Sequence, residues 1–159
     1  MKQVRIRWEA EHDRFTASGS HRGFEIPVNA PHEGKPAGFS ASELLLAGAG
    51  ACSAWDVIEI LRKRRQDVDA VDVTVSGEQA AEPPWPYVRL SLHFQVTGRG
   101  VERMAVERAV SLSVDKYCSV LATIRGVARI ETTIELTEHE PGQPTQDIPA
   151  SPAGRTVDG

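Results

Sequence analysis

The two cysteines of this chain, Cys52 and Cys118, are the residues whose type most directly suggests chemistry. Two thiols are too few for a four-ligand structural zinc site or a disulfide-rich secreted scaffold. They stand 66 positions apart, and a dithiol function needs their Cα atoms within about 4.4 to 6.8 Å of each other, which spacing alone does not establish. Two alternatives stay open, namely a redox pair and two small buried hydrophobic side chains.

Length and charge narrow the class of protein. The chain has 159 residues, with 22 acidic side chains against 18 lysines and arginines and a formal net charge of −4. One domain suits this length, and a chain of roughly 150 residues buries about 70% of its unfolded surface, so it needs no disulfide or metal staple. The acidic balance gives no reason to expect a nucleic-acid partner. The first residues lack the apolar segment of a secretory signal, so we expect a cytoplasmic protein in a reducing compartment.

Cys52 lies in a segment that predicts a long apolar helix over residues 40–65. Ser40 and Glu43 have the spacing of a capped helix start, and no charged residue separates Glu43 from Asp56. These twelve uncharged residues are too few for a membrane span of about 20, so we expect no membrane and a helix buried on most sides. Residues 47–54 are almost all small, which lets a second backbone pack closely.

The rest of the chain predicts the elements that would position Cys118. Alternating apolar and polar residues predict strands at 3–10, 13–17, 23–29, 71–75, 88–96 and 129–136, with a loop at 29–38. Apolar residues at helical spacing predict a helix over 102–117, which ends near Cys118, and a short helical piece at 119–125. The resulting class is α+β with a strongly curved antiparallel sheet. The domain covers 1–138, and 139–159, with four prolines and three glycines, predicts a disordered tail.

Two segments resemble a known family. Residues 42–57 read SELLLAGAGACSAWDV and residues 115–120 read DKYCSV, with a cysteine at the matching place in each. Over residues 2–137 the chain resembles the OsmC/Ohr family of organic-hydroperoxide reductases, with its YhfA-like branch the best match. The resemblance implies an OsmC-like fold, in which curved antiparallel sheets wrap around a long central helix. It also implies an intertwined homodimer with active sites at the subunit interface.

The resemblance further implies a role for each cysteine. Cys52 would attack the O–O bond of a small hydroperoxide as a thiolate and become a sulfenic acid. Cys118 would then condense with it to a disulfide, which an external dithiol reductant reopens. We therefore expect no metal and no cofactor.

An arginine completes the site in Ohr-type members, where a glutamate at the start of the helix holds it. Arg22 is the candidate on an early strand, with Arg14 second. The family's glutamate stands ten residues before the cysteine, a position that Ser42 fills here, whereas Glu43 stands nine before. That offset turns a helical side chain by about 100°. Glu43 therefore either holds the arginine or only caps the helix.

Other functions stay open beside the peroxidase. A chain lacking the Ohr-type glutamate could be a non-catalytic, redox-sensing or small-molecule-binding dimer of the same fold. Asp56, four residues after Cys52 on one helical face, either holds a cation at the site or faces solvent. A hydrolase or transferase with Cys52 as acyl nucleophile ranks last, because no histidine or aspartate stands at a suggestive spacing.

Overall fold

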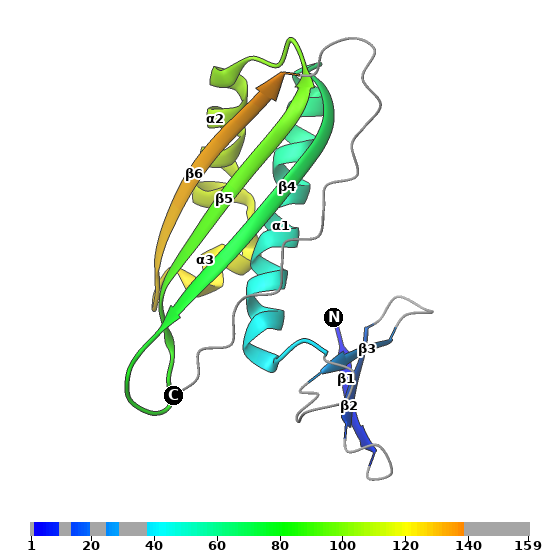
Figure 1. Cartoon of the computed structure of the whole chain (residues 1–159), viewed down its shortest axis with the longest axis vertical. Helices are drawn as coiled ribbons and strands as arrows, with labels where there is room; N and C mark the ends of the chain where they lie inside the picture. The colour runs from blue at the N-terminus through cyan, green and yellow to red at the C-terminus, as the bar shows by residue number, and fades with distance from the viewer. Residues whose placement is uncertain (1, 10–13, 20–24, 29–37, 139–159) are drawn as a thin grey trace.

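The computed structural model describes residues 2–9, 14–19, 25–28 and 38–138, and within them the α+β class is confirmed. Three strands come first, then a long helix, two long strands, a three-part helical segment and a last strand (Figure 1). In order they are β1 (Val4–Glu9), β2 (Arg14–Gly19), β3 (Glu25–Val28), α1 (Ala41–Lys63), β4 (Asp67–Gln79), β5 (Tyr87–Arg99), α2 (Arg103–Leu112), the π-helical η1 (Ser113–Tyr117), α3 (Ser119–Ile124) and β6 (Arg129–Glu138).

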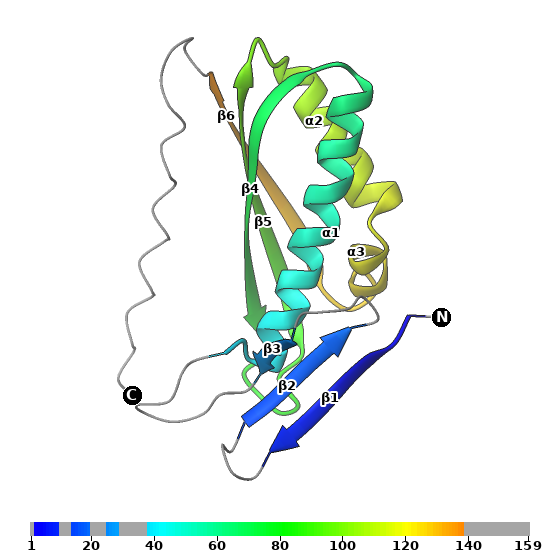
Figure 2. The same cartoon turned by 90° about the vertical axis from the view of Figure 1, so that its right-hand side faces the viewer.

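The strands form two three-stranded sheets, β1-β2-β3 and β4-β5-β6. The first is antiparallel throughout and lies beyond the N-terminal end of α1 (Figure 2). In the second, β4 pairs antiparallel with β5, but β6 pairs parallel with β5. The expected all-antiparallel pairing is therefore wrong for β6. The reason is that α2, η1 and α3 carry the chain back to the start of β5, which is the crossover that a parallel neighbour needs.

Helix α1 begins as its sequence predicts. The Glu43 backbone N–H donates to Ser40 Oγ at 3.2 Å, and the Ser40 N–H donates to Glu43 Oε2 at 2.7 Å, so the two residues form a capping box. By length and composition this helix could cross a membrane, since an 18-residue window has a mean hydropathy of 1.6. Only 28% of that window is buried within the chain, so the expectation of a helix buried on most sides is wrong for one chain alone.

The buried side of α1 packs against the second sheet and the helical segment. Val57 and Leu61 of α1 are fully buried, and alternate residues of β5 face them. The β5 residues are Leu90, Leu92, Phe94 and Val96. Figure 2 shows α1 running along the sheet with α2 and α3 beside it. This core fixes the distance between α1 and the segment that carries Cys118.

Most predicted elements are confirmed, with two differences of detail. Strand β4 begins four residues before the predicted strand at 71–75 and pairs with β5 along nearly its whole length. The helix predicted over 102–117 is α2 continued by a π-helical turn. The predicted loop at 29–38, apart from Gly38, and the predicted disordered tail at 139–159 lie outside the described residues.

Gly98 tests the packing of this core. A Cβ on Gly98 would lie 2.3 Å from the Asp67 backbone oxygen and 3.0 Å from the Val68 Cα, so β4 itself would have to move. We expect Gly98→Ala to lower the free energy of unfolding by about 1 to 3 kcal/mol in urea titrations. Gly126→Ala is the matched control, because a Cβ there meets nothing within 4 Å. Equal midpoints for the two variants would contradict the packing described.

Candidate active site

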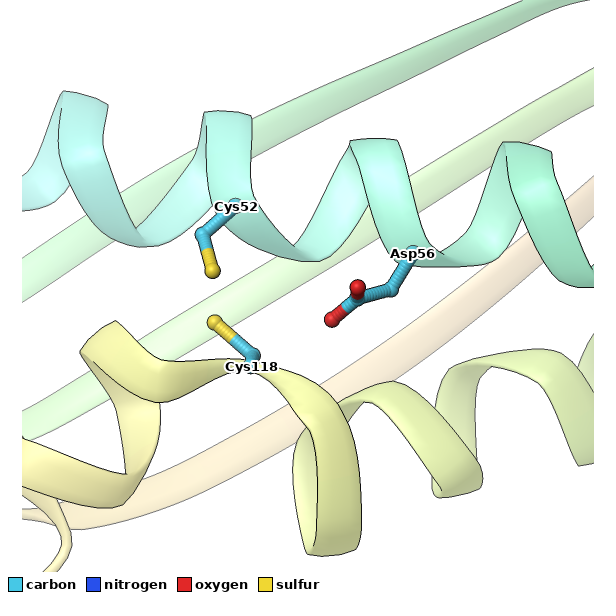
Figure 3. Close-up of side chains that lie close together, drawn as sticks. All are labelled: Cys52, Asp56 and Cys118. Atoms are coloured by element: carbon cyan, nitrogen blue, oxygen red, sulfur yellow. The ribbon is translucent and has the colours of Figure 1, made fainter.

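Cys52, Cys118 and Asp56 come together between α1 and the helical segment. The two Sγ atoms and a carboxylate oxygen of Asp56 all lie within 4.8 Å of one another. Figure 3 shows the two thiols pointing toward each other and the Asp56 carboxylate pointing into the same space. Cys52 and Asp56 come from successive turns of α1, and Cys118 comes from the junction of η1 and α3. We call these three residues the Cys–Asp triad.

The π-helical turn places Cys118. The Cys118 N–H donates to the Ser113 carbonyl at 2.9 Å, five residues back, which closes the wider π turn. Cys118 then leaves the helical conformation and serves as the N-cap of α3, where its Sγ accepts from the Leu121 N–H at 3.5 Å. Ser53, fully buried on α1, donates its hydroxyl to the same sulfur at 3.5 Å. The Cys118 thiol is therefore fixed from both helical elements.

Arg125 anchors the turn before Cys118 from the far end of α3. Its guanidinium donates to the backbone carbonyls of Val114 and Asp115. It also lies 3.6 Å from the Asp115 carboxylate. These carbonyls belong to η1, so Arg125 ties the end of α3 to the turn that positions the second cysteine.

Ser113 links the third member of the triad to the same turn. The Ser113 side chain is fully buried, and its Oγ lies 3.1 Å from Asp56 Oδ2 and 3.4 Å from the Ser53 carbonyl oxygen. The carboxylate oxygen and the carbonyl oxygen can only accept, so the Ser113 hydroxyl is the donor to them. Asp56 is half-buried rather than facing solvent, and its carboxylate is held at the cysteines by a buried donor.

The two thiols have different acidities. Burial alone would raise the pKa of Cys52, but hydrogen bonds from the Cys118 thiol, the Val120 N–H and the Ser119 hydroxyl together lower it below that of an ordinary thiol. Burial and donation to Cys52 raise the pKa of Cys118, despite its own hydrogen bonds from Leu121 and Ser53. Cys52 is thus the thiol that ionises first, and the Cys118 S–H donates a hydrogen bond to it.

The acidity of Cys52 should respond in opposite directions to its two neighbours. Cys118→Ala removes a donor to the thiolate and should raise the pKa of Cys52, whereas Asp56→Asn removes a nearby negative charge and should lower it. The pH dependence of alkylation by iodoacetamide, followed by mass mapping, measures both shifts. Shifts of the same sign in the two variants would contradict the arrangement.

The described residues do not show where the side chain of either candidate arginine lies, and they show Glu43 hydrogen-bonded to Ser40. Arg22 lies outside the described residues, and Arg14 begins β2 but its side chain is not among those described. Glu43 accepts from Ser40, whose backbone and side-chain hydrogen bonds lower the pKa of the carboxyl group despite slight burial. Capping therefore accounts for Glu43 at the start of α1 without an arginine.

The sequence signalled only part of this site. Ser53, Ser113 and Arg125 were not predicted, because serines and arginines have no distinctive spacing and their role depends on the π turn. One signal was available for Ser53, which directly follows Cys52 in a helix of otherwise apolar small residues. The spacing of four predicts that Asp56 lies on the helical face of Cys52, and the structure places its carboxylate beside both thiols rather than in solvent.

A groove of about 570 Å³ opens beside the triad. Its lining residues, shared between α1 and the α2–η1 segment, are Trp55, Asp56, Glu59, Ile60, Lys63, Arg64, Leu112 and Tyr117. Two aromatic side chains are largely exposed there, Trp55 at 67% and Tyr117 at 51%. Asp56 belongs to both the groove and the triad, so a molecule in the groove would lie next to the thiols.

The fold and the site define a class of protein, an α+β domain in which a cysteine on the long helix α1 faces a second cysteine at the junction of η1 and α3. The family model for OsmC-like proteins matches residues 32–133. Protein YhfA of Escherichia coli K12 is 43% identical over 135 residues, which cover 84% of this chain and 97% of YhfA. The chain belongs to the OsmC-like family.

Solved structures agree with this assignment. A hypothetical protein from Aquifex aeolicus VF5 superposes with a TM-score of 0.76 at 31% identity, over 88% of this chain and 98% of that one. A Legionella pneumophila protein described as an organic hydroperoxide resistance protein OsmC superposes with a TM-score of 0.60 at 14% identity, over 85% of this chain and 96% of that one. The OsmC-like fold and the YhfA-like branch expected from the sequence are thereby confirmed.

Proposed function

We propose that this protein is a thiol-dependent reductase of organic hydroperoxides, with Cys52 as the attacking residue and Cys118 as the resolving residue. The observation that carries the proposal is the placement of two free thiols within 4.8 Å, with the pKa of one lowered and that of the other raised. The Legionella protein of the same fold is described as an organic hydroperoxide resistance protein, which supports the choice of substrate.

The proposed reaction has two steps. The Cys52 thiolate attacks one peroxide oxygen, the O–O bond breaks, and the departing alkoxide takes a proton and leaves as an alcohol. The Cys118 sulfur then attacks the Cys52 sulfenic acid, and water leaves as the disulfide forms. An external dithiol restores both thiols by two exchanges, so the chain needs no metal or cofactor for this reaction.

Exposure and hydrogen bonding support this order of attack. Cys118 is 2% exposed, whereas Cys52 is half-buried, so a substrate reaches Cys52 more readily. The Cys118 S–H is a hydrogen-bond donor to Cys52, which stabilises the thiolate form of Cys52. Once Cys52 is oxidised, that donation ends and Cys118 faces the sulfenic sulfur directly.

Ionisation of Cys52 alone accounts for little of the expected rate. A free thiol with a pKa near 8.5 is already a few per cent to a tenth ionised near pH 7.5, so full ionisation gains about tenfold to thirtyfold, roughly 1.4 to 2 kcal/mol. Orientation of the peroxide and stabilisation of the departing alkoxide must supply the rest. We propose Arg22, or Arg14 in second place, for that role, with Glu43 near it at the start of α1.

A homodimer would complete the fold. In one chain 28% of the apolar window of α1 is buried, and Leu45 and Trp55 of this helix are exposed. The apolar face of β1 is also exposed, with Val4 69% and Ile6 54% accessible. A second copy of the chain would cover both. We propose an intertwined cytoplasmic dimer with its sites at the subunit interface and with neither nucleic acid nor membrane as a partner.

Peroxide titration tests the reaction. Reduced protein treated with one equivalent of cumene hydroperoxide should form one Cys52–Cys118 disulfide within each chain, mapped by non-reducing peptide mass analysis. Cys118→Ser should stop at a Cys52 sulfenic acid that dimedone traps, and Cys52→Ser should consume no peroxide. Unmodified thiols at millimolar peroxide would contradict the proposal.

The two arginines can be separated by substitution. Arg22→Ala should lower the second-order rate constant for peroxide by about 10² to 10³, the usual effect of losing one donor to a developing oxyanion. Arg14→Ala should change it little. Stopped-flow measurement of both variants shows which arginine assists the reaction. Equal small effects would contradict a role for either arginine in stabilising the leaving alkoxide.

The oligomeric state is a separate prediction. Sedimentation equilibrium should give the mass of two 17.3 kDa chains, because a second chain would bury the apolar residues of α1 that are exposed in one chain. A monomer that keeps its helix content and thermal transition at micromolar concentration would contradict the dimer.

A redox-sensing or small-molecule-binding dimer without turnover is the second candidate function. The observation in its favour is Glu43, which is engaged in the capping box, while Ser42 occupies the Ohr-type position. Steady-state assays with excess dithiol decide between the candidates, since a sensor would form the disulfide once without sustained peroxide consumption.

A further inference from the structure

Asp56 has no evident use in the proposed peroxide chemistry. A carboxylate beside a thiolate repels it, and this carboxylate lies within 4.8 Å of both sulfurs. The carboxylate is held in this position by a hydrogen bond from the fully buried Ser113 hydroxyl, with 3.1 Å between Ser113 Oγ and Asp56 Oδ2. A site built only to ionise Cys52 would be better served by a neutral residue at this place.

A divalent cation among the three side chains reverses the sign of this interaction. Two thiolates and a carboxylate carry three negative charges, and each then becomes attractive to the cation. Sulfur donors together with one carboxylate oxygen are a set that Zn²⁺ accepts. We propose that the Cys–Asp triad is a zinc site, with Cys52 Sγ, Cys118 Sγ and one Asp56 oxygen as its three protein ligands.

The geometry is close to what tetrahedral zinc requires. With Zn–S bonds of about 2.3 Å, two sulfur ligands lie about 3.8 Å apart, so three donors already within 4.8 Å need movements of about 1 Å or less. Figure 3 shows all three donor groups directed at one space from α1 and the Cys118 turn. The fourth position stays open to water or another small ligand.

The surroundings supply the outer contacts that metal sites in proteins use. Ser113 orients the Asp56 carboxylate, and hydrogen bonds from the Ser53 hydroxyl and the Leu121 N–H orient the Cys118 sulfur. Binding converts two thiols to thiolates and releases their protons. Because zinc would occupy the sulfur lone pair that attacks a peroxide, the metal and the peroxide should compete for Cys52.

The inference goes beyond the proposed function and does not depend on it, because zinc binding requires no peroxide turnover. The sequence predicts no metal because the thiol chemistry implied by the resemblance uses none and because two cysteines are too few for a four-ligand structural site. The three-ligand site arises from the fold, which brings Asp56 and two cysteines 66 positions apart to one point.

The test uses the full-length reduced protein without added thiols. Co²⁺ should bind one ion per chain and give thiolate-to-cobalt charge-transfer absorption with the intense visible bands of a tetrahedral site. Zn²⁺ should displace it, and competition with a chromophoric chelator gives the affinity. Asp56→Asn should weaken zinc binding by at least about 100-fold and Ser113→Ala by about 10- to 100-fold. Asp72→Asn, on β4, is the control and should bind as the parent does.

The outcomes separate this site from the peroxide chemistry. Zinc affinity in Asp56→Asn equal to that of the parent, or absence of charge-transfer absorption in the parent, would overturn the three-ligand site. Asp56→Asn keeps both thiols and removes the charge that opposes ionisation of Cys52, so it should form the Cys52–Cys118 disulfide with peroxide at least as fast as the parent does. Loss of zinc binding with an intact disulfide reaction supports the inference, and circular dichroism of each variant excludes unfolding as the cause.

Discussion

The contact between Ser53 on α1 and Cys118 at the start of α3 is the constraint on which the site depends. Both side chains are buried, and the hydroxyl donates to the sulfur at 3.5 Å. This hydrogen bond holds the Cys118 turn against α1 at Ser53, the residue that directly follows Cys52. A small residue at position 53 permits this approach, and a polar one makes it directional. The core of β5 and α2 behind it holds the two elements at that separation.

Helix α1 serves two purposes on two faces. One face carries Val57 and Leu61 into the core of its own chain, whereas the opposite face remains largely uncovered. The cysteines lie where the helix meets the Cys118 turn, so the same element that positions Cys52 would also form the proposed subunit contact. A substitution on either face would therefore be expected to affect both the site and the assembly.

Periodicity predicted most of the fold but could not supply the strand directions or the π turn. The alternation of Leu90, Leu92, Phe94 and Val96 predicts β5 directly, because one face of the strand is buried. The direction of β6 depends on how three helical segments return the chain, which no local pattern encodes. The π turn at Ser113 likewise depends on packing, since its sequence continues a normal helical repeat.

The candidate site was predicted in part. The two cysteines and their roles came from resemblance, since a separation of 66 residues gives no information about distance in space. Asp56 was placed on the correct face by its spacing of four, but its burial and its Ser113 partner required the tertiary structure. Arg22 falls outside the described residues, so the arginine remains a prediction from the sequence.

We propose that this site accelerates peroxide attack beyond what an ionised thiol achieves. The most direct test is the second-order rate constant of the reduced protein with cumene hydroperoxide, measured by stopped flow at pH 7.5 beside free cysteine. We expect a ratio far above the roughly thirtyfold that complete ionisation of Cys52 could give. A ratio at or below thirtyfold would contradict it, because the site would then supply only a lowered pKa and no orientation or stabilisation of the leaving alkoxide.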